Sequence, residues 1–182
     1  TKGVIMEKNY FKDTKNVYFA KRNEKVVLPS KEEENAGYDF YAFFDEDYLE
    51  IPPFETKLIP TGISWACSPE FYLQIEERSS TGSKGIKRSA GVVDSGYRGE
   101  IKIAITNVNN KPLIISNIDE SQLRNKYNIF YDIIFYSTQK AIAQGIIHRV
   151  EKMNVSTLPL EELLSIPSSR GDKGFGSSNK VK

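Results

Sequence analysis

The chain has 182 residues, with 25 lysine and arginine residues against 24 aspartate and glutamate residues, so its formal net charge is +1. This near balance argues against a protein that binds nucleic acid through bulk positive charge. The length suits one domain with a real core, and no run approaches the roughly 18 to 20 apolar residues that a membrane-spanning helix needs. We therefore expect one domain with tails and neither a nucleic acid nor a membrane partner.

The chain contains one cysteine, Cys67, and one histidine, His148. A lone cysteine cannot form an intramolecular disulfide, and the N-terminus lacks the pattern of a secretion signal, so we expect a cytoplasmic protein. A structural zinc site of four Cys or His ligands within one subunit is excluded. Nucleophilic catalysis by a Cys–His pair is also disfavoured.

Residues 1–16 are polar without a clear period and are expected to form a loosely attached N-terminal arm. From Val17 onward, short apolar segments alternate with Pro, Gly, Asn and Asp, which is typical of many short β-strands. Strands are expected at residues 58–63, 72–76, 100–106 and 141–150. In the third of these, alternation places three isoleucines on one face. The pattern favours an all-β sandwich or jelly roll.

Helical signals are few. Residues 119–126 begin with Asp119, a suitable N-cap, and residues 158–164 form a second short candidate. Residues 168–182 hold Gly, Ser and charged residues around one aromatic, so a flexible, solvated C-terminal arm is the simplest interpretation. The same residue types are what a mobile arm needs to close over a nucleoside triphosphate, since Gly admits close backbone approach and Arg binds phosphate in a bidentate manner.

Residues 91–101 read Gly-Val-Val-Asp-Ser-Gly-Tyr-Arg-Gly-Glu-Ile and are expected to form a β-hairpin whose tight turn begins at Asp94. In that turn Gly96 supplies the positive φ of a type II turn. Tyr97 follows, so that a ring and a carboxylate flank one small cavity. An ordinary structural turn explains why Asp94 and Gly96 are present, but it does not explain why a large aromatic residue, Tyr97, follows the turn.

Three further segments carry polar side chains in suggestive places. A hydroxyl-rich turn that can open a short helix holds Arg78, Ser79 and Ser80, which suit phosphate oxygens but equally suit a solvated loop. Asp39 follows a glycine turn and precedes an aromatic strand. Gln144 interrupts an apolar strand, so it makes either a structural hydrogen bond or a ligand contact.

The order of these segments carries a resemblance to a known family. Five segments in this order, between about Val17 and Ser178, resemble the five ordered motifs of the trimeric dUTPase family. They are Ala-Gly-Tyr-Asp, Arg-Ser-Ser, the segment of residues 91–101, Ile-Ala-Gln and Arg-Gly-Asp-Lys-Gly-Phe-Gly-Ser-Ser. The resemblance implies a dUTPase-like jelly roll (β-clip) over residues 17–167 and a homotrimer with shared active sites. It also implies that a flexible arm, residues 168–182, closes a neighbouring active site.

The implied activity is that of a dUTP diphosphatase, which hydrolyses dUTP to dUMP and pyrophosphate with Mg²⁺. That reaction limits uracil incorporation into DNA and supplies dUMP for dTMP synthesis. By the resemblance, Asp94 is the general base that activates water for attack on the α-phosphorus. Tyr97 lies against the deoxyribose, and Asp39 lies near the metal, through water. The other implied substrate-binding residues are Gly91, Val92 and Val93 through main-chain groups, then Arg78, Ser79, Ser80 and Gln144, and from a neighbour's arm Arg170, Phe175, Gly176, Ser177 and Ser178.

The chain departs from the family pattern at three places. Arg88 stands where many members have Asn, which leaves open whether this position contacts substrate. Gln144 is preceded by Lys-Ala-Ile-Ala rather than Gly-Asp-Arg-Ile-Ala. It also lies 50 residues after Asp94, more than is usual in the family. The surplus falls at about residues 116–139, an aromatic-rich segment that is expected to form a small inserted subdomain.

Two alternative functions follow from these features. Some phage dUTPases bind a repressor through an insertion at this place, so a non-catalytic or bifunctional regulatory module with a protein partner at residues 116–139 stays open. A dCTP deaminase shares the fold but needs a proton-transferring carboxylate three residues before the strand's Asn107. This chain has Ala104 there, which disfavours deamination.

Overall fold

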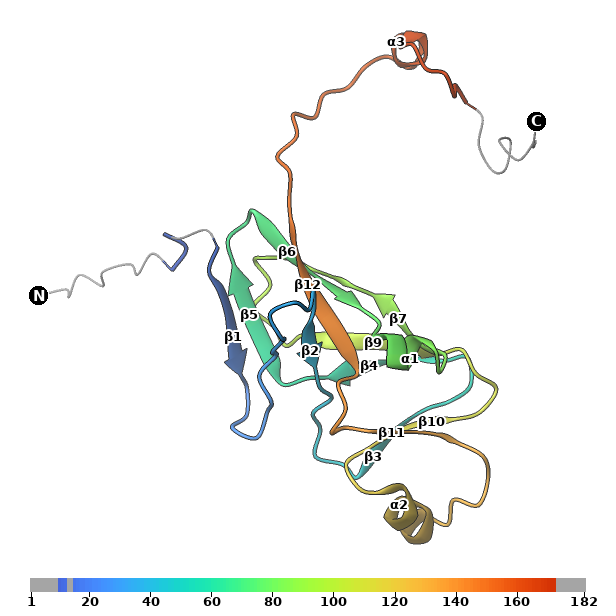
Figure 1. Cartoon of the computed structure of the whole chain (residues 1–182). Helices are drawn as coiled ribbons and strands as arrows, with labels where there is room; N and C mark the ends of the chain where they lie inside the picture. The colour runs from blue at the N-terminus through green and yellow to red at the C-terminus, as the bar shows by residue number, and fades with distance from the viewer. Residues whose placement is uncertain (1–9, 13–14, 173–182) are drawn as a thin grey trace, which may run out of the picture. The chain divides into compact units, whose positions relative to one another are not determined.

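The computed structural model describes residues 10–12 and 15–172. The chain divides into two compact units, residues 1–150 and 151–182. Every strand within the described residues lies in the first unit, and the fold is mostly β, as predicted (Figure 1). In the described part of the chain, no helix is long and apolar enough to cross a membrane.

The strands form four small sheets. The largest has the order β2 (Tyr38–Phe40), β12 (Ala143–Arg149), β6 (Phe71–Glu76) and β8 (Val92–Val93). The others are β4 (Thr56–Pro60), β9 (Lys102–Asn107) and β7 (Ile86–Ala90); β11 (Ile134–Ser137), β10 (Leu113–Ser116) and β3 (Tyr48–Ile51); and β1 (Val17–Lys21) with β5 (Ile63–Cys67). The helices are α1 (Ser79–Gly82), α2 (Glu120–Tyr127) and α3 (Leu160–Ser165).

The core forms where alternating strands turn their apolar residues inward. Ile101, Ile103 and Ile105 are at most 1% exposed, as the alternation predicted. They pack in one cluster with Trp65 of β5 and Leu73 of β6. Burial of each such side chain contributes about 1.5–3 kcal/mol to stability, so this cluster holds the sheets together.

The predicted hairpin at residues 91–101 is wrong. β8 pairs with β6, whereas β9 pairs with β4 and β7, so the two strands enter different sheets. The reason lies in the residues after the turn: the Ile101 N–H donates to the Ile63 carbonyl at 2.7 Å, and the Glu100 carboxylate accepts from the Gly62 N–H at 2.8 Å. The chain therefore crosses from one sheet to another.

The tight turn itself is present but is not of type II. The Tyr97 N–H donates to the Asp94 carbonyl at 3.1 Å. Gly96 does not have a positive φ, in contrast to Gly62, where φ is +66°. At Gly62 a Cβ would stand 2.4 Å from a Val26 methyl carbon. The strand predicted at residues 58–63 therefore breaks into β4 and β5.

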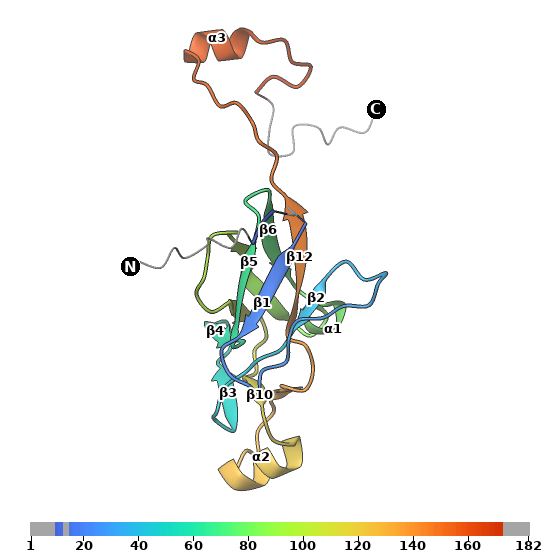
Figure 2. The same cartoon turned by 90° about the vertical axis from the view of Figure 1, so that its left-hand side faces the viewer.

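Residues 116–139 contain α2 and β11 and have a buried cluster beside them. Ile114, Leu123 and Ile129 are buried in it and pack against partly buried neighbours that include Phe135. Figures 1 and 2 show α2 with β3 and β10 at one end of the strands. Asp119 occupies the N-cap as predicted, although its side chain makes no capping hydrogen bond. That this segment is an insertion relative to the family stays a prediction.

Asp47 should make the attachment of α2 sensitive to acid. Its carboxylate accepts hydrogen bonds from Lys126 at 2.5 Å and from the Tyr127 hydroxyl at 2.9 Å, and the Lys126 bond, followed by the Tyr127 bond, holds the pKa of Asp47 below its usual range. A carboxylate whose pKa is lowered by folding stabilises the fold above its unfolded pKa and loses this contribution as the pH falls through the folded pKa. Asp47→Asn should lower the melting temperature by about 1–3 °C at pH 7.

The same comparison at about pH 3 distinguishes this interaction from a general effect of the substitution. The difference between Asp47→Asn and the unaltered protein should shrink there, as followed by circular dichroism. A difference that stays constant over the pH range would show that the Asp47 charge does not hold α2.

Asn107 should be the most costly polar side chain to remove from the core. Its amide donates to the carbonyls of Ile51 at 3.0 Å and Lys111 at 2.7 Å, and its oxygen accepts from the Asn109 N–H at 3.1 Å. Asn107→Ala removes these three bonds, one of them buried and two partly buried, and should lower the free energy of unfolding by about 2–3 kcal/mol in urea titration. The exposed Asn110→Ala serves as the control, and an equal, small effect of both would contradict the assignment.

Candidate functional site

A polar cavity of about 340 Å³ opens beside α1, and we call it the Arg78 cavity. Its lining comes from the segment before β2, from β2 itself, from the start of α1 and from β12. The lining residues are Asn35, Ala36, Gly37, Asp39, Arg78, Ser79, Ser80 and Gln144. The structure thus brings together five of the predicted site residues from three distant segments.

The Arg78 backbone is fixed by the first turn of α1. Its N–H donates to the Thr81 hydroxyl oxygen at 3.0 Å, and that hydroxyl donates to the Arg78 carbonyl at 2.9 Å. The guanidinium is held separately: Nε lies 3.0 Å from the Asp39 carboxylate, and Nη1 donates to the Ala141 carbonyl at 3.3 Å. One third of the side chain stays exposed, so an anion in the cavity can reach it.

Gln144 lies on β12, between β2 and β6. Its register partners are Asp39 on β2 and Glu76 on β6, and its side-chain amide donates to the Glu77 carbonyl at 2.8 Å. The side chain of Gln144 packs closely against Gly37. Residue 37 must be a glycine, because a Cβ there would stand 2.6 Å from the Gln144 side-chain oxygen. Gln144, expected from the sequence to be buried, is half-buried; it makes a structural hydrogen bond and also lines the cavity.

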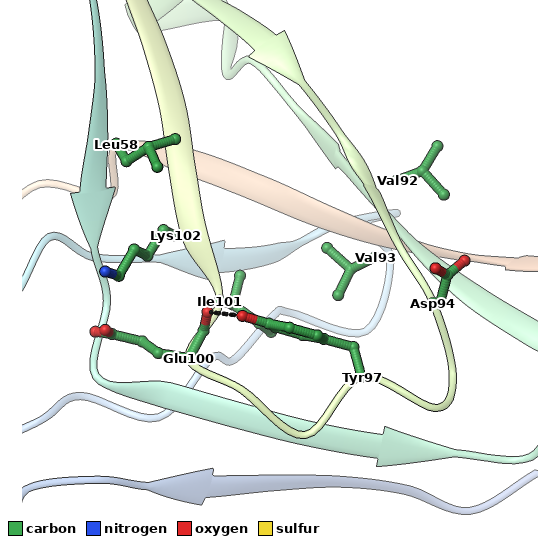
Figure 3. A pocket seen from close by; sticks show the side chains of 8 residues that line it. All are labelled: Leu58, Val92, Val93, Asp94, Tyr97, Glu100, Ile101 and Lys102. Carbon is green, nitrogen blue, oxygen red and sulfur yellow. Dashed lines mark hydrogen bonds between the residues drawn. The ribbon is translucent and has the colours of Figure 1, made fainter.

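A second cavity of about 300 Å³ surrounds the predicted turn, and we call it the Asp94 cavity. It is lined by Leu58, Val92, Val93, Asp94, Tyr97, Glu100, Ile101 and Lys102 (Figure 3). The Tyr97 hydroxyl donates to the Glu100 carbonyl at 2.9 Å, which fixes the ring. Figure 3 shows this ring extending from the turn toward Glu100, with Val93 on β8 and Asp94 directly after that strand.

The two cavities share no lining residue. Gly91 lines neither, but its carbonyl accepts from the Ile75 N–H at 2.7 Å and so aligns β8 with β6. Arg170 belongs to the second unit. Phe175, Gly176, Ser177 and Ser178 lie outside the described residues. The chain thus presents its predicted site in separate parts.

Sequence reasoning missed several residues that line the Asp94 cavity. Glu100 precedes β9, Lys102 is the first residue of β9, and Leu58 comes from its partner strand β4. Alternation around Ile101 and Ile103 is a signal that Lys102 faces away from the core. No local signal identifies Leu58, because its place depends on the pairing of β4 with β9.

Arg88 points to neither cavity. Its guanidinium Nη2 lies 2.9 Å from the Glu76 carboxylate, and its backbone N–H donates to the Glu77 carboxylate at 3.2 Å. Burial raises the pKa of Glu77, but the Lys87 ammonium and backbone donors outweigh it and hold that pKa below its usual range. In this structure Arg88 therefore ties β7 to β6 rather than lining a site.

The described residues contain no group of three or more His, Cys, Asp or Glu side chains placed to hold a metal. Asp39 is the one carboxylate in the lining of the Arg78 cavity, and it is paired with Arg78. A magnesium ion keeps several waters and prefers substrate phosphates to a full set of protein ligands. The residues present fit a metal that arrives bound to a phosphate-bearing ligand.

An arginine and two serines line one cavity, and a carboxylate and a ring line another, which are residue types that suit a phosphate ester. A family model described as dUTPase matches residues 23–120. The chain is 34% identical over 164 residues to the deoxyuridine 5'-triphosphate nucleotidohydrolase of Vaccinia virus (strain Copenhagen), covering 89% of this chain and 92% of that relative. The chain belongs to the dUTPase family.

Other relatives agree. The corresponding enzyme of Wolbachia pipientis subsp. Culex pipiens (strain wPip) is 31% identical over 150 residues, covering 81% of this chain and 82% of that relative. Among solved structures, the Staphylococcus bacteriophage 80alpha dUTPase with dUPNHPP has a TM-score of 0.67 and 21% identity, covering 92% of this chain and 100% of that chain. This likeness shows that the fold is dUTPase-like, as predicted.

The contact between Gly37 and Gln144 generates a prediction. Gly37→Ala should push Gln144 away from the Glu77 carbonyl, because the added methyl cannot fit beside the glutamine Cβ at 2.9 Å. We expect the KM for dUTP to rise about 5-fold, the loss of roughly one hydrogen bond, as measured by pyrophosphate release. At Gly96 a Cβ would meet nothing within 4 Å, so Gly96→Ala should leave the melting temperature unchanged. An unaltered KM in Gly37→Ala would contradict the role of this contact.

Proposed function

We propose that this chain, as a member of the dUTPase family, hydrolyses dUTP to dUMP and pyrophosphate with Asp94 as the general base. The enzyme is a dUTP diphosphatase. The observation that carries the assignment of the base is that Asp94 and Tyr97 line the same cavity, with the ring fixed by its bond to Glu100. A carboxylate beside a fixed ring suits attack by water next to a sugar.

In the proposed mechanism each cavity has its own task. Asp94 takes a proton from the water that attacks the α-phosphorus, a role worth roughly 10²- to 10⁴-fold in rate. Tyr97 packs against the deoxyribose and excludes a 2'-hydroxyl, while main-chain groups of Gly91, Val92 and Val93 bind the uracil edge. Arg78, Ser79, Ser80 and Gln144 hold the phosphates.

The substrate is dUTP with its magnesium ion. Bound Mg²⁺ neutralises phosphate charge and so assists departure of pyrophosphate. Asp39 would hold it through a bound water while its other interaction, with Arg78, keeps the guanidinium in place. The ion thus enters as part of the substrate.

We further propose a homotrimer in which each active site combines cavities from different subunits. Support comes from the separation of the Asp94 and Arg78 cavities, which have no lining residue in common. One subunit supplies the base and another supplies the phosphate-binding arginine. A third supplies the arm, with Arg170, Gly176, Ser177 and Ser178 on the phosphates and Phe175 over the uracil, which excludes water when substrate is bound.

A protein partner at residues 116–139 is a second proposal, supported by surface aromatics. Phe130 is 85% exposed and Tyr131 is 52% exposed, both just after α2. Exposed aromatic side chains in a small area are typical of protein-binding surfaces. This would make the enzyme bifunctional. Deletion of the exposed residues around Phe130 and Tyr131 without loss of dUTP turnover would separate partner binding from catalysis.

The cytoplasm is the location that we propose. Cys67 is free and buried, and burial raises the pKa of its thiol despite the opposing charge of Arg98. A protonated, buried thiol is unreactive, so Cys67 is a packing residue that needs no oxidising compartment.

The test is pyrophosphate release from dUTP, UTP, dTTP and dCTP with magnesium. The unaltered protein should turn over dUTP selectively, and Asp94→Asn should lower kcat at least about 100-fold while it still binds the nucleotide. Exposed Asp45→Asn is the matched control and should keep full activity. Deamination of dCTP, or no turnover of dUTP by a folded protein, would contradict the proposed function.

A further inference from the structure

We propose that Tyr136 is a positioning residue that prepares Arg78 for the phosphates of the substrate. The inference rests on the proposed function of the Arg78 cavity and adds a residue from a different segment. It makes β11 part of the substrate-binding structure, although β11 lies within residues 116–139.

The inference starts from one carbonyl oxygen with two donors. The Tyr136 hydroxyl donates to the Ala141 carbonyl at 2.6 Å, and Nη1 of Arg78 donates to the same oxygen at 3.3 Å. Because Nε of Arg78 is paired with Asp39 at 3.0 Å, the Ala141 carbonyl is the second fixed point of the guanidinium. Tyr136 therefore holds the acceptor that orients Arg78.

Burial makes this hydroxyl a dependable donor. Tyr136 is only 3% exposed and belongs to the main core. Burial raises the pKa of Tyr136, and the nearby Arg78 charge opposes this only in part, so the hydroxyl stays protonated at neutral pH. The Lys84 ammonium lies 5.8 Å from the centre of the ring, within the range of a cation–π contact.

The alternation of β11 explains how one strand serves two regions. Phe135 packs against the cluster of Ile114, Leu123 and Ile129, whereas Tyr136 faces the main core. β11 is held in place by parallel pairing with β10, where Tyr136 lies opposite Ile115. The strand thus joins the packing around α2 to the carbonyl that holds Arg78.

Preorganisation gives this arrangement its functional consequence. An arginine held in its binding orientation loses less conformational freedom when phosphate arrives, which improves binding rather than the chemical step. Loss of the Tyr136 hydroxyl should therefore act on binding of the phosphates and leave recognition of the nucleoside unchanged.

The experiment is Tyr136→Phe, which removes one oxygen and keeps the ring. We expect the KM for dUTP to rise about 5- to 20-fold with kcat within about 3-fold, the effect of a hydrogen bond in a charged network. By calorimetry the affinity for dUpNHpp with Mg²⁺ should fall by the same factor, and the affinity for deoxyuridine should not change. Tyr127→Phe is the matched control, since its hydroxyl bonds Asp47, and it should leave both affinities unchanged.

A double-mutant cycle distinguishes positioning from general packing. In an Arg78→Ala background, Tyr136→Phe should have no further effect on dUpNHpp affinity. Additive effects, an unchanged affinity in Tyr136→Phe alone, or an equal loss of deoxyuridine affinity would each overturn the inference.

A rescue variant separates the role of the hydroxyl from a loss of stability, and the binding measurements separate it from the proposed function. Replacement of Tyr136 by p-aminophenylalanine keeps a donor at the same place and should restore the KM, so failure of this rescue in a folded protein counts against the inference. Absence of dUTP turnover in the unaltered protein would contradict the proposed function. The affinities for dUpNHpp and deoxyuridine would still decide whether Tyr136 positions Arg78.

Discussion

The pairing of β12 with β2 on one side and β6 on the other sets the position of the Arg78 cavity. Gln144 stands opposite Asp39 and Glu76 in this register, which brings segments from three parts of the chain to one place. A shift of one residue would turn Gln144 to the other face of the sheet, because side chains alternate along a strand. Gly37 protects the register by leaving room for the glutamine.

Charged pairs around this sheet orient side chains more than they stabilise the fold. Arg78 with Asp39, Arg88 with Glu76 and Lys87 with Glu77 are all partly exposed pairs at 2.9–3.0 Å. Pairs of this kind contribute about 0–1 kcal/mol each, small beside the buried isoleucines of β9. Their main effect is on geometry, since they hold the partly exposed Arg78 guanidinium and the edges of two strands in defined positions.

Separate cavities in one chain connect the fold to the proposed assembly. The Asp94 turn belongs to a crossing between two sheets, whereas Arg78 is the N-cap residue of α1, just after β6. In the proposed homotrimer, the base and the phosphate-binding arginine come from different subunits, which ties activity to assembly. Tyr136 extends this logic inside the subunit, because it connects the packing around α2 to the orientation of Arg78 through the Ala141 carbonyl.

Local sequence determined the parts of this protein that depend on neighbouring residues. The alternation around Ile103 predicted a strand with a buried face, the Asp94–Tyr97 spacing predicted a turn whose carboxylate and ring line one cavity, and the ordered motifs predicted the family. These three are confirmed, although the turn is not of type II and joins no hairpin. These features are local because strand period and turn geometry involve only a few successive residues.

Only the tertiary structure decided which strands pair and which distant groups meet. The period of two is the same for a hairpin and for two strands in different sheets, so the sequence could not show that β8 and β9 separate. Arg78 and Ala141 are 63 residues apart in the sequence. Nothing in the sequence around Tyr136 distinguishes it from the other aromatic residues of its segment. Its role arises from a carbonyl that the packing of the whole sheet brings within reach, and no short-range pattern encodes that contact.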